Sequence, residues 1–279
     1  MIVTIVGTGL IGGSMALVAR SSGFAQRVIG VESRSDHAAT ALSLGLVDEM
    51  CDLEEAIERS DFIVLSVPVN AVENLLPRIL DNVNKQVVMD VSSIKLGVIE
   101  CIRNHPNNKR FVPTHPMWGT EYSGPRAASG DAFRNKAAVI CNKENCDADA
   151  LLQVQEFYKY LQMHLVYMDA AEHDIHVAYV SHISHITSFA LANTVLEKEK
   201  EENAIFELAS GGFESTVRLA KSNAATWVPI FMQNRDNVLD VLNEHIHQLK
   251  KFKACLEKEN YTYLEELITD ANKINRIIK

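Results

Sequence analysis

Residues 1–12 read Met-Ile-Val-Thr-Ile-Val-Gly-Thr-Gly-Leu-Ile-Gly, and this stretch decides the fold. Its first six residues are apolar except for Thr4 and rich in β-branched side chains, which predicts a strand buried on both faces. The next six have the spacing GxGxxG, and apolar residues at helical spacing follow them, among them Met15 and Leu17. A strand, this glycine pattern and a helix predict the phosphate-binding turn of a dinucleotide-binding fold.

Each glycine of this turn has its own task. Gly7 permits the tight turn, Gly9 lets a pyrophosphate approach the backbone, and Gly12 lets the helix pack closely on the strand. A glycine-rich turn in an unrelated α/β fold is the alternative interpretation. The residues that we expect to contact the dinucleotide here are Gly7, Thr8, Gly9, Leu10, Ile11 and Gly12.

An acidic residue follows the second predicted strand, which covers residues 27–31. Glu32 lies 20 residues after Gly12, the spacing at which a carboxylate hydrogen-bonds the ribose of the adenosine. Because the same charge repels a 2′-phosphate, the sequence favours NAD over NADP. Arg34 and Arg20 keep NADP open as the alternative, since a nearby guanidinium can accept that phosphate.

Strand and helix patterns alternate to about residue 168, and only helical periodicity remains after it. The alternation predicts βαβ units and a largely parallel, doubly wound sheet, so we expect a Rossmann-type domain over residues 1–168. An all-α domain is expected over residues 169–279. The later strand-like runs of the predicted sheet are residues 61–66, 86–90, 111–114, 137–141 and 164–168.

The helical half begins with a capping box, Asp169 followed three residues on by Glu172. The helix it opens is expected to run to about residue 200 and to end in a charged, solvated run at residues 197–202. Such an apolar, all-helical domain favours a homodimer. Apolar residues at helical spacing, which predict a buried face further on, are Val238, Leu239, Leu242, Ile246 and Leu249.

Polar residues follow three predicted strands, and in an open α/β sheet the carboxyl ends of the strands meet at the ligand crevice. These segments are Ser66-Val67-Pro68, Ser92-Ser93 and His115. One of the two serines at 92 and 93 is expected to cap the next helix. The other is free to hold a substrate hydroxyl or to orient an imidazole.

The stretch from Thr114 to Gly124, Thr-His-Pro-Met-Trp-Gly-Thr-Glu-Tyr-Ser-Gly, carries the candidate general base. Pro116 disfavours the helical region for the residue before it, so His115 is held extended. A titratable imidazole on a stiff peptide, followed by a polar loop, suits proton transfer, although a His-Pro pair is more often only a turn.

The helical half adds a candidate cation. Arg218 has apolar neighbours, which suggests a guanidinium held at a domain boundary, where it could take a substrate carboxylate in a bidentate pair. We expect one of four histidines to face the crevice and no metal site, since their spacing matches no zinc motif. The four are His173, His176, His182 and His185.

Composition excludes several classes of protein. The net charge of -9 argues against nucleic acid as the main partner. No apolar run approaches the ~20 residues that span a bilayer, and the N-terminus reads as a strand, so we expect a cytoplasmic protein. Five cysteines without CxxC spacing predict free thiols.

The ordered set of motifs resembles prephenate dehydrogenase, an oxidoreductase family of tyrosine biosynthesis, over essentially the whole chain. The resemblance implies NAD(P)-linked oxidative decarboxylation of prephenate to 4-hydroxyphenylpyruvate. Family members that act on arogenate are the alternative. The motifs that carry the resemblance are residues 7–14, 90–95 (Asp-Val-Ser-Ser-Ile-Lys), 115–124, 181–185 (Ser-His-Ile-Ser-His) and the stretch that ends at Arg218.

The resemblance also implies roles for individual residues. His115 would accept the proton of the substrate hydroxyl, with Ser93 orienting that hydroxyl or the imidazole. Arg218 would bind a substrate carboxylate. The pocket would be shaped by His185, Thr120, Glu121, Gly211 and Trp227, and Ser66, Val67 and Pro68 would line the nicotinamide ribose.

The chain departs from the family pattern at three places. Trp118 stands where a small residue is usual, and Ser184 replaces a proline. Ser215 stands where an aspartate commonly pairs with the arginine, so the guanidinium of Arg218 is either oriented by Glu214 or left freer.

Two other functions stay open at this point. One is a β-hydroxyacid dehydrogenase, which would need a catalytic lysine, for which Lys221 is the candidate. The other is a non-catalytic dinucleotide sensor, which would have no need of the serine, histidine and arginine set.

Overall fold

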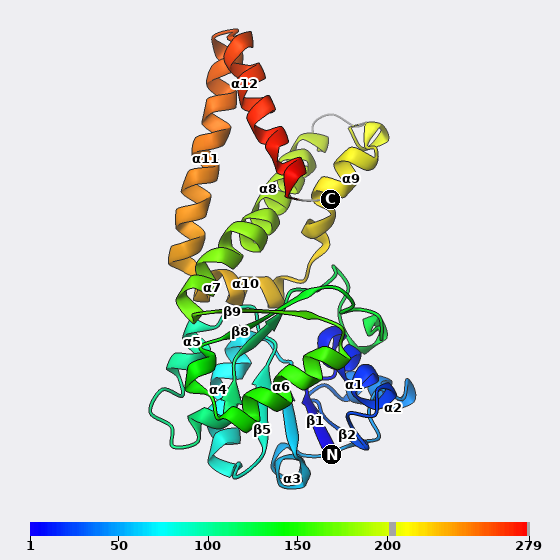
Figure 1. Ribbon diagram of the computed structural model, residues 1–279. Coiled ribbons are helices and arrows are strands. Elements are labelled where there is room, and N and C mark those ends of the chain that lie inside the picture. The colour runs from blue at the N-terminus through cyan, green and yellow to red at the C-terminus, as the bar shows by residue number, and fades with distance from the viewer. Residues whose placement is uncertain (201–204, 278–279) are drawn as a thin grey trace.

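The computed structural model describes residues 1–200 and 205–277, and it shows an α/β domain with a helical part standing on it (Figure 1). The strands are β1 (Ile2–Val6), β2 (Arg27–Val31), β3 (Glu49–Met50), β4 (Phe62–Leu65), β5 (Val87–Asp90), β6 (Phe111–Val112), β7 (Thr114–Pro116), β8 (Ala137–Cys141) and β9 (His164–Met168). The helices of the α/β domain are α1 (Leu10–Ser21), α2 (Ser35–Ser43), α3 (Leu53–Arg59), α4 (Val69–Asn82), α5 (Leu96–Glu100) and α6 (Ala148–Tyr160). Those of the helical part are α7 (Ala170–Val177), α8 (Ile183–Glu199), α9 (Gly211–Val217), α10 (Ala224–Gln233), α11 (Arg235–Glu257) and α12 (Tyr261–Ala271).

The main sheet is parallel throughout, with strand order β3-β2-β1-β4-β5-β6. This order reverses direction between β1 and β4, as in a doubly wound dinucleotide-binding sheet, and it confirms the predicted fold class. The alternation of side chains along β4 shows the two layers. Phe62 and Val64 pack with residues of α1 and α6, whereas Ile63 and Leu65 pack with residues of α4.

The prediction of one continuous sheet through residue 168 was wrong in its last strands. Only β6 joins the main sheet, while β7, β8 and β9 form a second sheet in which β7 and β8 run antiparallel. Pro113 separates β6 from β7 and has no N–H to continue a ladder, so the chain leaves the main sheet there. His115 therefore lies on an edge strand of the second sheet, paired with Val139.

The helical part begins at the predicted cap. The Asp169 carboxylate accepts the N–H of Glu172 at 2.8 Å. The helix does not continue evenly to residue 200, because a π-helical turn, Ala178–His182, separates α7 from α8. Such a turn holds one extra residue, and it rotates the side chains after it relative to those before it. Residues 201 and 202 of the charged run lie outside the described part of the chain.

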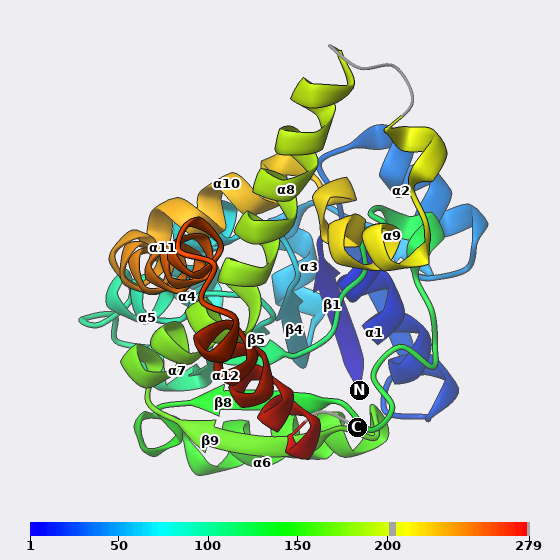
Figure 2. The same cartoon turned by 90° about the horizontal axis from the view of Figure 1, so that it is seen from above.

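The predicted buried face of α11 is mostly exposed in the single chain. Val238 is buried, but Leu239 is 44% and Leu249 is 55% exposed. The reason is that α11 and α12 form a hairpin that projects from the rest of the molecule in Figure 1, and α11 is seen nearly end-on in Figure 2. Within the described residues, none of the helices has the length and apolar character to cross a membrane.

Candidate active site

The glycine-rich turn has the shape needed to hold a dinucleotide phosphate. Gly7 has φ +93°, and a Cβ there would lie 2.4 Å from the carbonyl oxygen of Ser66. A Cβ on Gly12 would lie 2.1 Å from the carbonyl oxygen of Gly7, whereas one on Gly9 would meet nothing within 4 Å. Two glycines therefore allow close packing, and the third leaves open space beside the uncapped N-terminus of α1. The residues present fit a bound dinucleotide.

Glu32 lies where the ribose of the adenosine is expected. Its carboxylate accepts hydrogen bonds from the backbone N–H and the hydroxyl of Thr8, at 3.1 and 3.2 Å. Arg34, one candidate for a 2′-phosphate, instead forms an ion pair with Asp36 at 2.8 Å. Arg20 pairs with Asp48 at 2.8 Å. Both guanidinium groups thus have carboxylate partners other than Glu32.

The segment after β4 lies against the glycine-rich turn. A Cβ on Gly7 would also come within 2.9 Å of Val67 Cγ1, so Ser66 and Val67 border the phosphate site directly. Pro68 follows them at the start of α4. These three predicted nicotinamide-ribose residues therefore lie at the switch point between β1 and β4.

Neither serine after β5 caps a helix, so the capping expectation was wrong. α5 begins only at Leu96, and the Ser92 hydroxyl donates to the carboxylate of Asp90 instead. It also accepts from Nζ of Lys95, at 2.8 Å, and this lysine forms an ion pair with Asp90 while both are fully buried. Ser93 is half-buried, and its hydroxyl has no hydrogen-bond partner among the described residues. It remains free for a substrate.

His115 is partly buried and is joined to His173, one of the four candidate histidines, and through it to Asp174, which the sequence did not indicate. Its Nδ1 lies 2.9 Å from Nε2 of His173, and Nδ1 of His173 lies 2.7 Å from Oδ1 of Asp174. Burial, followed by the nearby His173, Lys95 and His182, lowers the pKa of His115 well below its ordinary value. The histidine is therefore neutral near pH 7 and can accept a proton.

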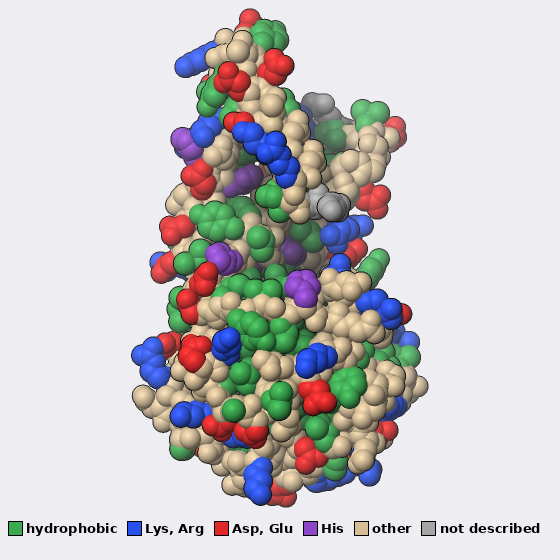
Figure 3. All heavy atoms as spheres, in the orientation of Figure 1, with side chains coloured by type: hydrophobic (Ala, Val, Ile, Leu, Met, Phe, Trp, Pro, Cys, Tyr) green, Lys and Arg blue, Asp and Glu red, His purple; other side chains and the backbone are tan. Residues whose placement is uncertain are grey.

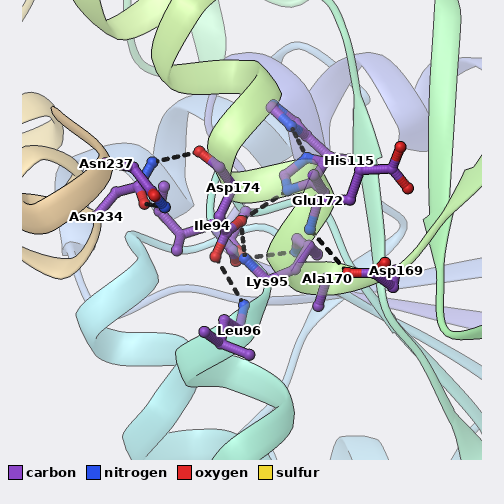
Figure 4. A network of polar contacts seen from close by, with 12 residues as sticks. Ile94, Lys95, Leu96, His115, Asp169, Ala170, Glu172, Asp174, Asn234 and Asn237 are labelled. Carbon is purple, nitrogen blue, oxygen red and sulfur yellow. Dashed lines mark hydrogen bonds and ion pairs between the residues drawn. The ribbon is translucent and has the colours of Figure 1, made fainter. Parts of the chain in front are cut away.

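Asp174 connects the two domains. Its carboxylate accepts the backbone N–H groups of Lys95 and Leu96, both at 2.9 Å, and so caps α5 from the helical part. Its carbonyl oxygen accepts from Nδ2 of Asn234 at 2.7 Å, as Figure 4 shows. The only sequence signal for this residue is its place beside His173, one turn into a capped helix.

Arg218 is paired with Glu121, an acid from the loop after β7. Its Nη1 donates to Glu121 at 3.0 Å, and the hydroxyl of Ser215 donates to the carbonyl of Gly212 in its own helix. The structure shows neither of the two expected alternatives, pairing with Glu214 or a freer guanidinium, because the loop after β7 brings Glu121 to Arg218. Hydrogen bonding by its own backbone and then by Arg218 lowers the pKa of Glu121.

Rings from the π-helical turn, α8 and α10 pack together in the helical part. The ring of His185 stacks on Trp227 with centroids 3.4 Å apart, and the buried ring of His182 lies 6.0 Å from the same tryptophan. Burial lowers the pKa of His182 to about 4. More than one of the four helix histidines therefore faces the site.

The other predicted positions lie around this site or apart from it. Thr120 is exposed, and its hydroxyl accepts the N–H of Tyr122, while Gly211 opens α9. Trp118 packs edge to face on Phe133, 5.2 Å away, in the core of the α/β domain, and Ser184 is exposed. No group of three metal-ligating side chains occurs in the described ranges, 1–200 and 205–277.

A doubly wound dinucleotide sheet with a neutral, partly buried histidine and a paired arginine at its crevice defines a dinucleotide-dependent oxidoreductase. Comparison with known proteins identifies the family. Residues 15–167 match the prephenate dehydrogenase nucleotide-binding domain, and residues 169–270 match the prephenate dehydrogenase dimerization domain. The chain belongs to the prephenate dehydrogenase family.

Several relatives resemble it over almost its full length. Prephenate dehydrogenase of Bacillus subtilis is 29% identical over 92% of this chain and 71% of its own length. Cyclohexadienyl dehydrogenase of Zymomonas mobilis is 27% identical over 99% of this chain and 96% of its own. The structure of prephenate dehydrogenase from A. aeolicus in complex with hydroxyphenyl propionate and NAD+ has a TM-score of 0.91 and 28% identity, covering 100% of this chain and 98% of that one.

Proposed function

We propose that the protein converts prephenate to 4-hydroxyphenylpyruvate by NAD-dependent oxidative decarboxylation, in tyrosine biosynthesis. The observation that carries the proposal is the partly buried His115, held by His173 in a chain that also has a dinucleotide turn and an arginine paired with the loop after β7. Relatives named prephenate dehydrogenase support it, and so does the A. aeolicus complex with hydroxyphenyl propionate and NAD+.

The side chains suit each part of this chemistry. NAD, if held by the glycine-rich turn and Glu32, would supply the acceptor for the hydride that leaves the ring carbon carrying the hydroxyl. His115 accepts the hydroxyl proton as the carbon–oxygen bond becomes a carbonyl, and the free hydroxyl of Ser93 orients the reacting group. The ring carboxylate then leaves as carbon dioxide, its bonding electrons enter the ring, and the aromatic product forms. The protein needs to position the reactants and to take one proton.

Arg218 supplies the positive charge for a dianionic substrate on a chain of net charge -9. The guanidinium is 49% exposed while paired with Glu121, so it has donors left for a substrate carboxylate. The stacked rings of His185 and Trp227 would form an apolar wall of the substrate pocket, and Thr120 and Gly211 would lie at its rim. This arrangement favours a flat ring that carries a carboxylate.

NAD is the proposed hydride acceptor. Glu32 would accept hydrogen bonds from the ribose hydroxyls, and its charge would repel a 2′-phosphate. The pairing of Arg34 with Asp36 and of Arg20 with Asp48 supports this preference, because a free guanidinium near Glu32 is what NADP would require.

The experiment is a measurement of NADH absorbance with prephenate and with arogenate, for the wild type and for His115→Asn. We expect turnover of prephenate that the substitution abolishes while NAD still binds, as followed by fluorescence titration. His176→Asn is the matched control, since His176 is exposed on α7. Turnover of arogenate alone would change the substrate and keep the mechanism. Normal NAD binding without turnover of either would support a sensor and refute the enzyme.

The protein is also proposed to act as a homodimer. The exposed apolar side chains of α11 include Leu239, Ile246, Leu249 and Leu256. Apolar side chains also appear on the helical part in Figure 3, and the matching family domain is described as a dimerization domain. Sedimentation equilibrium should give a dimer, and Leu249→Asp should shift it toward monomer. A monomeric wild type would contradict this assignment.

A further inference from the structure

His115, His173 and Asp174 form a continuous chain of hydrogen bonds that ends in the protein interior. The links are 2.9 Å between the two imidazoles and 2.7 Å between His173 and the carboxylate. The side chains of His173 and Asp174 are 1% and 3% exposed, so water does not compete for these bonds. His115 precedes His173 by 58 positions, and the hydrogen bond between them joins β7 to α7.

The partners decide which atoms carry protons. Oδ1 and Oδ2 of Asp174 accept the N–H groups of Lys95 and Leu96, so this carboxylate acts as an acceptor. The Nδ1 of His173 must then donate to it, which leaves Nε2 of His173 as the acceptor in the neutral ring. The Nδ1 of His115 must in turn donate to that atom. Nε2 of His115 is consequently the nitrogen with a free lone pair.

We propose that His173 and Asp174 are positioning residues that keep the proton on Nδ1 of His115, so that Nε2 receives the substrate proton. This inference rests on the proposed function, in which His115 is the base. When Nε2 takes the proton, the ring of His115 becomes positively charged. The Nδ1 proton can then move toward His173, and the positive charge is shared by both rings beside Asp174.

The other charged and titratable groups around His115 and His173 do not stabilise a positive charge on these rings, so the carboxylate of Asp174 is needed for that. Lys95 comes from the segment before α5, and His182 comes from the π-helical turn, and both oppose a positive charge on His115. The charge of Lys95 is already paired with Asp90, and His182 is buried next to Asn234. Asp174 is thus the acidic group in direct contact with the histidine pair.

Asn234 holds the far end of this chain in place. Its Nδ2 donates to the carbonyl of Asp174 at 2.7 Å, and its Oδ1 accepts from Asn237 at 2.7 Å. It lies at the break between α10 and α11 and is buried. The helical part therefore fixes the orientation of the base that the other domain carries, and the same contacts join the two domains.

Activity measurements on substituted enzymes test the role. Asp174→Asn should reduce kcat at least about tenfold, because an amide no longer selects one tautomer, while the KM for NAD changes little. The acidic limb of the pH–rate profile of Asp174→Asn should lie about one pH unit lower than that of the wild type. The reason is that the protonated histidine pair loses the negative charge that stabilises it. A contact that only joins the domains would lower stability without moving the limb.

Conservative variants separate the tautomer from packing. His173→Gln offers an amide oxygen to Nδ1 of His115 and should keep more activity than His173→Leu, which offers no acceptor. Glu172→Gln and His176→Gln are matched controls, since both residues are exposed on α7. Equal kcat in His173→Gln and His173→Leu would overturn the proposal, as would wild-type kcat in Asp174→Asn. If Asp174→Asn does not fold, the comparison of His173→Gln with His173→Leu still tests the proposal.

Nitrogen NMR of histidine-labelled protein gives a readout that needs no substrate. The signals of His115, assigned by their loss in His115→Asn, should show a protonated Nδ1 and an unprotonated Nε2 near pH 7. In Asp174→Asn this preference should disappear. A wild-type His115 protonated at Nε2 would refute the relay, even if prephenate is turned over. The predicted tautomer without any turnover would refute the proposed function alone.

Discussion

Replacing Lys95 by methionine should lower the free energy of unfolding by about 3 kcal/mol, because it leaves a buried carboxylate without its cation. Lys95 and Asp90 are both 0% exposed and form an ion pair, and Nζ of Lys95 also donates to Ser92 at 2.8 Å. Removal of one partner of such a pair costs about 3–5 kcal/mol. The lower end applies here, since Asp90 keeps the N–H groups of Ser92 and Thr114, at 3.1 and 3.0 Å.

The assay is urea unfolding followed by circular dichroism at one fixed protein concentration, since a dimer couples stability to concentration. Lys85→Met is the control, because Lys85 is exposed in the same domain, and it should change stability by no more than about 0.5 kcal/mol. The double variant Asp90→Asn with Lys95→Met should be less destabilised than the sum of the single variants, since neither charge then stays unpaired. A loss below about 1 kcal/mol for Lys95→Met, or strict additivity, would refute the reasoning.

Three further predictions concern the cofactor and the base. Gly12→Ala should lower the free energy of unfolding by about 1–3 kcal/mol and weaken NAD binding, because the new Cβ would lie 2.1 Å from the Gly7 carbonyl oxygen. The control in the same denaturation and titration series is Gly130→Ala, whose Cβ meets nothing within 4 Å. Glu32→Ala should raise the ratio of kcat/KM for NADP to kcat/KM for NAD by about tenfold or more, since it removes the charge that repels the 2′-phosphate. An unchanged ratio in initial-rate assays would show that another group selects the cofactor. The depressed pKa of His115 sets the pH dependence: the base works unprotonated, so kcat/KM should stay level as pH falls through the ordinary histidine range and decline only below it. An acidic limb near the ordinary histidine pKa of about 6.5, measured with fresh substrate, would contradict this assignment.

The fold and the dinucleotide end of the site were predictable from the sequence, because they depend on patterns within a few residues. Residues 2–6, the GxGxxG turn and the helix after it follow one another directly, so strand, phosphate site and helix are encoded together. The cap formed by Asp169 and the N–H of Glu172 is equally local. These features need no knowledge of what packs against them.

The proton pathway and the pairing of charges depended on the tertiary structure. His115 meets His173 across 58 positions, Lys95 meets Asp174 across 79, and Arg218 meets Glu121 across 97. The chain contains several acids and histidines that could have made each contact, and Glu214 was only one of two alternatives for Arg218. Only the departure of β7 from the main sheet and the packing of α7 on α5 select among them, because a hydrogen bond forms between neighbours in space.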